Sequence, residues 1–156
     1  MTETKDEIIA RLQARVKAQR SEKEASDREE AIRKRDTEKR LKKLKASWDG
    51  VFSLVSSSVQ KTNADLKGTT IEIAFERSVR PESDTVFKSY VLRFSSTPVI
   101  NHRISVLIEV DMDGNVDLFF GDNENKLAEE ETSLSSFNSD RIERTITRML
   151  SFASPK

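Results

Sequence analysis

The stretch that decides the fold is RISVLIEVDMDGNVDLFFG, residues 103–121. Apolar residues recur at every second position in both of its halves: Ile104, Val106, Ile108, Val110, Val116, Leu118 and Phe120. A period of two with one apolar face predicts antiparallel strands that are covered on one side only. The dipeptide Asp113-Gly114 between the halves is typical of a hairpin turn. The segment therefore predicts two paired strands, residues 103–111 and 115–121.

The same segment carries carboxylates at alternate positions, and these suit a second interpretation. They are Glu109, Asp111, Asp113 and Asp117. A calcium-binding loop has oxygen ligands at such spacing and a glycine at its turn, where this chain has Gly114. The loop fails at its last ligand, because Phe120 stands where a bidentate glutamate is required. Since the outward residues of a hairpin alternate by construction, the sequence favours the hairpin over a weak metal site.

Two segments before the hairpin show the same alternation. TIEIAFE (residues 70–76) and SYVLRF (residues 89–94) each present apolar residues on one face. The turn residues between the strands are Pro81, Pro98 and Asn101. After the hairpin, the acidic, serine-rich segment 122–137 lacks a clear alternation and is predicted to be a loop. The chain therefore predicts a four-stranded antiparallel meander.

A final helix is predicted after this loop, with Asn138 or Ser139 as its N-terminal cap. Its apolar face consists of Ile142, Ile146, Met149, Leu150 and Phe152. This helix and a long helix at the start of the chain both have an apolar stripe to bury, so they should share one face of the sheet. The predicted fold class is α+β, with the element order αββββα.

The first third of the chain predicts one long helix, residues 4–67. No Gly or Pro occurs before Gly50, and Thr4 and Glu7 have the spacing of a capping box. Six acidic residues precede a basic residue by four positions, and each such pair contributes about 0.2–0.5 kcal/mol. Gly68 suits the residue that ends the helix, and Gly50 is its predicted weak point.

From residue 41 onwards the helix acquires an apolar stripe, which predicts contact with a core. The stripe consists of Leu41, Leu44, Trp48, Val51, Phe52, Val55, Val59 and Leu66. We therefore expect a charged helical arm at residues 1–45 and an α+β domain at residues 46–156, with Trp48 buried. Most heptad positions of the arm are polar, which excludes a long coiled coil. A short coiled-coil seam is predicted at Ile9, Leu12 and Val16.

Three apolar residues point away from the predicted helices by the period-two argument. They are Val91, Leu107 and Phe119, and they lie on successive strands. In one interpretation Leu127, Leu134 or Phe137 from the segment 122–137 covers them. In the other they form the interface of a homo-oligomer or of a protein partner. The sequence leaves both open.

The predicted arm also carries a row of like charges. Residues 1–45 hold 15 Lys/Arg against 10 Asp/Glu, whereas residues 46–156 hold 12 against 17. The basic stripe consists of Arg35, Lys39, Lys42, Lys43 and Lys45. Three interpretations remain for it: a solvated helix face, contact with an acidic protein surface, or contact with nucleic acid phosphates. The candidate acidic surface consists of Asp122, Glu124, Glu129, Glu130 and Glu131, contributed by a second copy.

The composition excludes several functions and leaves an interaction protein. The chain has no cysteine, and its single histidine, His102, has no nucleophile signature beside it. Phosphate loops, G-x-S-x-G and H-E-x-x-H are absent, and no apolar run approaches a membrane span. We predict a non-enzymatic, cytoplasmic adaptor without cofactors, which forms homo-oligomers and presents its charged helix to a protein partner. The alternative is a sequence-nonspecific nucleic-acid-binding protein that uses the basic stripe.

Overall fold

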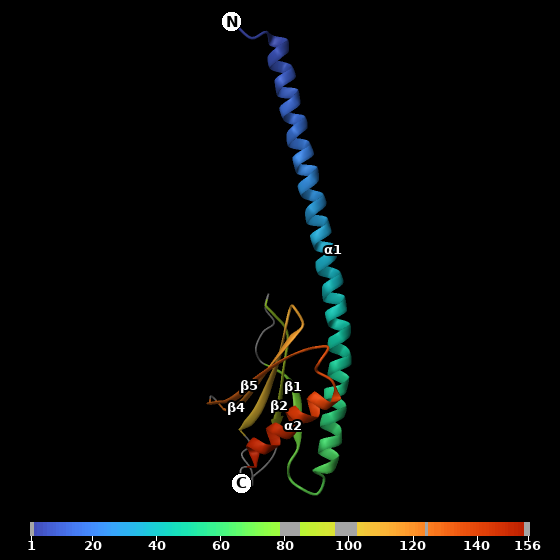
Figure 1. Cartoon of the computed structure of the whole chain (residues 1–156), viewed down its shortest axis with the longest axis vertical. Helices are drawn as coiled ribbons and strands as arrows, with labels where there is room; N and C mark the ends of the chain where they lie inside the picture. Colours follow the sequence, from blue (N-terminus) through green and yellow to red (C-terminus); the bar gives the residue numbers. More distant parts are fainter. Residues whose placement is uncertain (1, 79–84, 96–102, 124, 155–156) are drawn as a thin grey trace. The chain divides into compact units, whose positions relative to one another are not determined.

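The computed structural model describes residues 2–78, 85–95, 103–123 and 125–154. The chain divides into two units, Met1–Lys42 and Lys43–Lys156. The elements are α1 (Lys5–Asp65), β1 (Ile73–Arg77), β2 (Val86–Phe94), β3 (Ile104–Asp111), β4 (Asn115–Asp122), β5 (Asn125–Ser133) and α2 (Ser139–Ala153), as Figure 1 shows. Five residues named above lie outside the described residues: Pro81, Pro98, Asn101, His102 and Glu124.

The predicted long helix is confirmed, and its first turn has the predicted capping box. The backbone N–H of Glu7 donates to Thr4 Oγ1 at 3.3 Å, and that of Thr4 donates to Glu7 Oε2 at 3.2 Å. Arg11 donates to Glu3 through both terminal nitrogens, at 2.6 and 2.7 Å. The two capping-box contacts satisfy backbone N–H groups that a helix start leaves without an intrahelical partner. Gly68 follows the end of α1 with a positive φ of 95°.

The strands form one antiparallel sheet in the order β1-β2-β3-β4-β5. The four predicted strands are present, but the prediction of a loop at residues 122–137 was wrong, because residues 125–133 form β5 beside β4. Gly114, with a φ of 85°, closes the β3–β4 hairpin, as Asp113-Gly114 predicted. Asn123, with a φ of 56°, begins the turn into β5.

One face of the sheet, here called the inner face, forms the core together with both helical segments of the unit Lys43–Lys156. The strand residues fully buried on this face include Leu92, Ile104, Val106, Ile108, Val110, Val116, Leu118 and Phe120. The helical residues buried in the same cluster are Trp48, Val51, Val55, Val59, Ile142, Ile146, Met149 and Ala153. Trp48 is 2% exposed, and its ring stacks on Tyr90 of β2 at 5.2 Å between centroids. The prediction that both helices share one face of the sheet is therefore confirmed.

Side chains fix the ends of these helices against the sheet. The Asn63 amide donates to the carbonyl of Ile73 at 3.0 Å and accepts from its N–H at 2.8 Å, which ties the last turns of α1 to the start of β1. Asn138 Oδ1 accepts from the N–H of Arg141 at 3.1 Å, so Asn138 is the N-cap of α2.

Candidate functional site

The opposite face of the sheet, here called the outer face, carries an apolar row in register across three strands. Val91 of β2 pairs with Leu107 of β3, and Leu107 pairs with Phe119 of β4. The row ends in carboxylates at both sheet edges, because Glu76 pairs with Val91 and Glu129 pairs with Phe119. The register thus brings together the three residues that the sequence predicted to be neighbours.

Of the described residues in the segment 122–137, neither Leu134 nor Phe137 covers this row. Leu134 and Phe137 are buried in the core cluster, at 8% and 1% exposed. Leu127 is the extra residue of a β-bulge in β5, between the partners of Phe120 and Gly121, and it is 41% exposed. Within the described part of Lys43–Lys156, both helical segments lie against the inner face. The apolar row is therefore partly exposed.

An acidic row lies beside the apolar row on the same face, two residues along the strands. Glu109 pairs with Asp117, and Asp117 pairs with Glu131. Burial raises the pKa of Asp117 above its ordinary 3.8, and the neighbouring carboxylates Glu131, Asp111, Glu109 and Glu129 raise it further. The register therefore concentrates carboxylates at this end of the outer face.

The other end of the outer face is basic. Arg93 on β2, Arg103 before β3 and Lys126 on β5 lie here, and all three are exposed. Arg93 pairs with Glu76 through its Nε at 2.9 Å, and Lys126 pairs with Glu129, so both cations contact the ends of the apolar row. Along the strands, the face thus passes from acidic through apolar to basic.

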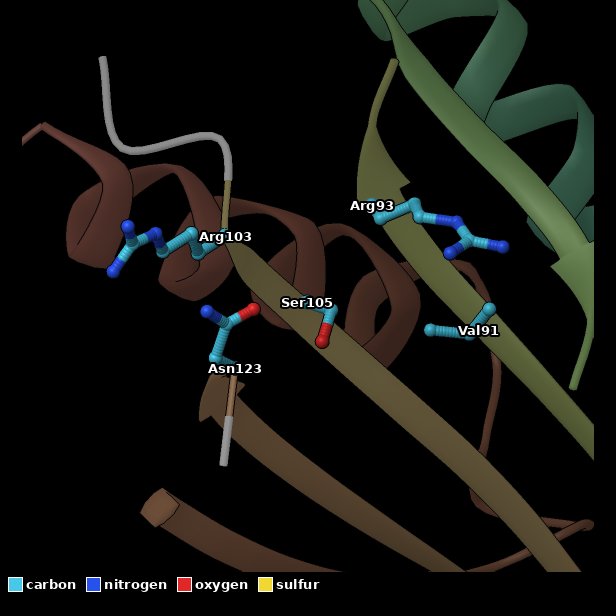
Figure 2. Close-up of a pocket in the computed structure, with 5 residues that line it drawn as sticks. All are labelled: Val91, Arg93, Arg103, Ser105 and Asn123. Atoms are coloured by element: carbon cyan, nitrogen blue, oxygen red, sulfur yellow. The ribbon is translucent and has the colours of Figure 1, made fainter. Parts of the chain in front are cut away.

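Figure 2 shows an open pocket at this basic end. It has a volume of about 380 Å³ and is lined by Val91, Arg93, Arg103, Ser105 and Asn123. The side chains come from β2, from the start of β3 and from the end of β4. Val91 belongs to the apolar row, so the pocket adjoins it.

The β3–β4 turn has the geometry of a hairpin rather than of a calcium loop. Asp111 Oδ1 accepts from the N–H groups of Asp113 and Asn115, each at 2.9 Å, and Oδ2 accepts from the Asn115 amide at 3.0 Å. The carboxylate therefore holds the turn itself. Among the residues that the structure describes, no group of three or more His, Asp or Glu side chains is arranged to hold a metal ion.

The structure disperses the predicted acidic surface. Glu130 lies on the inner face, where its oxygens form ion pairs with Arg141 at 3.2 Å and Arg148 at 3.1 Å, both on α2. Glu129 and Glu131 lie on the outer face, as their pairing with Phe119 and Asp117 shows. Asp122 ends β4, and Glu124 lies outside the described residues. The carboxylates that the structure does bring together are Glu109, Asp117 and Glu131. The sequence predicted Glu109 and Asp117 only as outward positions of the hairpin, and Glu131 only as one member of the acidic surface.

The predicted features of α1 are exposed. All five residues of the basic stripe are exposed: Arg35, Lys39, Lys42, Lys43 and Lys45. Ile9, Leu12 and Val16 of the predicted seam are 40%, 55% and 48% exposed. Apolar side chains at this exposure are available for contact with another helix.

The chain matches no protein-family model, no curated protein and no solved structure at a significant level. In the described residues, no helix has the length and apolar character needed to cross a membrane.

Proposed function

We propose that the chain is a non-enzymatic interaction protein that self-associates through the outer face of its sheet and presents the charged helix α1 to a protein partner. The observation that carries this proposal is the apolar row Val91, Leu107 and Phe119, which lies in register on a face without a helical layer among the described residues of its unit. A solvated outer face normally alternates polar residues with the buried ones. Three adjacent apolar side chains on it are typical of a contact surface.

The size of these side chains supports the proposal. Phe and Leu are among the residues whose burial stabilises most, at about 25 cal/mol for each Å² of apolar surface removed from water. The charged rim supplied by Glu76 and Glu129 resembles the polar rim that surrounds the apolar centre of protein interfaces.

The helix α1 supplies the second contact. Its exposed seam, Ile9, Leu12 and Val16, suits a short pairing with an apolar stripe on another helix. The exposed basic stripe suits an acidic protein surface, which it would attract without a dedicated pocket. We infer that α1 is the part of the chain that selects the protein partner.

Leu107→Lys tests self-association. The substitution places a charge at the centre of the apolar row, so we expect the solution mass measured by sedimentation velocity to fall from a dimer or larger species to a monomer. The circular-dichroism spectrum should stay unchanged, because Leu107 lies outside the core cluster. Thr147→Lys, which adds the same charge at an exposed position of α2, is the matched control and should leave the mass unchanged. A wild-type chain that is monomeric at 100-fold different concentrations would refute self-association.

A second candidate function, nonspecific nucleic-acid binding, is favoured by the five exposed cations of the basic stripe. Five phosphate contacts predict a slope of log K against log salt of about −4 to −5. On the protein-partner proposal, random duplex DNA should bind feebly at physiological salt, and Lys39→Glu with Lys43→Glu should weaken capture of an acidic protein partner. Micromolar or tighter DNA binding that this double substitution abolishes would favour the nucleic-acid function instead.

A further inference from the structure

We propose that the partner on the outer face is a second copy of this chain, stacked face to face and rotated by 180° about an axis parallel to the apolar row. This inference rests on the proposed self-association and specifies its geometry. In this arrangement the apolar rows of the two copies meet, and the acidic row of each copy lies over the basic end of the other.

The charge layout of the face is the first argument. Glu109, Asp117 and Glu131 lie on one side of the apolar row, two residues along the strands. Arg93 pairs with Ala74 and Lys126 pairs with Gly121, two residues to the other side of the apolar row. A face that is acidic at one end and basic at the other complements its own inverted copy, which is what a two-fold interface requires.

The alternative two-fold axis, parallel to the strands, gives the opposite result. It would place the acidic row of one copy over the acidic row of the other, where Asp117 already lies among Glu109, Glu131 and Glu129. Like charges brought together at an interface oppose association. The charge layout therefore selects the axis parallel to the apolar row.

The cations are available to a second partner. The side chains of Arg93 and Lys126 are 50% and 61% exposed although each contacts a glutamate of its own chain. A guanidinium has five N–H donors and an ammonium has three, so both groups can contact further carboxylates. In the inverted dimer, Lys126 would face Glu131 of the second copy.

The area of the face suits a dimer. Five strands about 4.8 Å apart, with about eight residues each at 3.3 Å, give a face of about 600 Å² per copy. Two such faces bury about 1,200 Å² in total, which lies at the lower end of specific protein interfaces. Sheets that stack in this way lie about 10 Å apart, the spacing of a β-sandwich.

Paired charge reversals in the full-length chain test the complementarity. Asp117→Lys with Glu131→Lys reverses two of the three charges of the acidic row, and Arg93→Glu with Lys126→Glu reverses two of the cations at the basic end. We expect each of these double variants to dimerise at least about tenfold more weakly than the wild type in sedimentation velocity. The fourfold variant, which restores opposite signs at the two ends, should recover a dissociation constant within about threefold of wild type.

Circular dichroism shows whether each variant folds, and the ion pairs removed are exposed and contribute little to folding. If both double variants dimerise as the wild type does, charge does not orient the dimer and the inference is overturned. If the double variants fail to dimerise and the fourfold variant folds but stays monomeric, it is also overturned. In neither case is self-association itself refuted, since Leu107→Lys tests that separately.

Cross-linking tests the orientation directly, because the wild-type chain has no cysteine. Ser105→Cys and Glu109→Cys lie two residues before and after Leu107, on the same face. In the inverted dimer they lie over each other about 10 Å apart, so a short bismaleimide should join the two variants when they are mixed. Each variant alone should then cross-link at most weakly. If each variant cross-links efficiently with itself and the mixture gives no product that joins the two variants, the two-fold axis is instead parallel to the strands.

Discussion

The two faces of the sheet use the same five strands and the same alternation of residues. Within the described part of the unit Lys43–Lys156, helical segments cover only the inner face. On the inner face, the row Leu92, Val106 and Phe120 continues to Ala128 of β5, and its first three members are at most 1% exposed. On the outer face, the next row, Val91, Leu107 and Phe119, ends in glutamates and stays partly exposed.

The difference is one of partners rather than of residue type. The inner row is buried because helical side chains cover it, whereas no described helical segment of the same unit covers the outer row. Alternation in a sequence therefore assigns residues to one face of a sheet or the other. It does not predict which face is covered by helices of the same chain.

Trp48→Ala should cost about 3–5 kcal/mol in the free energy of unfolding, measured with denaturant. Trp48 is 2% exposed and stacks on Tyr90, so the substitution opens a cavity beneath the inner face. Phe52→Ala on the same helix is the matched control, because Phe52 is 36% exposed and should cost clearly less. Equal costs for the two substitutions would contradict the placement of the core.

Glu130→Gln should lower the free energy of unfolding by about 1–2 kcal/mol, whereas Glu131→Gln should not lower it. Glu130 faces inward and bridges Arg141 and Arg148 of α2. Glu131, the next residue, faces outward and lies beside Asp117. Thermal unfolding of both variants in the same buffer measures the two free energies of unfolding. Because the two residues are adjacent in sequence, the comparison separates the effect of the inner face from that of the outer face. A larger loss for Glu131→Gln would show that the assignment of faces in β5 is wrong.

Much of the fold was predictable because local signals agree with one another. The long helix has a capping box and no helix breaker before Gly50, and the hairpin has strict alternation around Asp113-Gly114. These signals act over a few residues and agree with the fold of the whole chain, so the helix and the hairpin can be predicted from them. The bounds of the elements differ from prediction by only a few residues at most ends.

The fifth strand was missed because its sequence, NKLAEEETS, contradicts strand propensity. Its inner-face positions are Ala128, Glu130 and Thr132, of which none is a large apolar residue. The glutamate is tolerated there because two arginines from α2 neutralise it. That compensation is a tertiary contact, so it cannot be found from the strand itself. The turn residue Asn123, between Asp122 and Asn125, was the available signal.

The candidate site was predictable to the same extent. The apolar row follows from alternation alone, because Val91, Leu107 and Phe119 lie on strands that were correctly assigned. The acidic row needs the register between β4 and β5, which sets Asp117 against Glu131. Because residues 122–137 were predicted to be a loop, their carboxylates could not be assigned to either face of the sheet.

Asp117→Asn makes the smallest predicted change and tests the electrostatics of the outer face. Because burial and the neighbouring carboxylates Glu131, Asp111, Glu109 and Glu129 raise the pKa of Asp117, the folded chain holds this proton more tightly than the unfolded chain. The free energy of unfolding should therefore fall as the pH rises from about 3.8 through the raised pKa, and this loss should persist at neutral pH. Asparagine removes it, so the variant should be more stable than wild type by about 0.2–1 kcal/mol at pH 7, the usual effect of a like-charge cross-strand pair. The gain should vanish near pH 3, and Asp49→Asn, at an exposed position of α1, should show neither effect. A gain that persists undiminished in acid would mean that asparagine improves packing rather than relieving charge, and the acidic row would then lose its support as a concentrated negative surface.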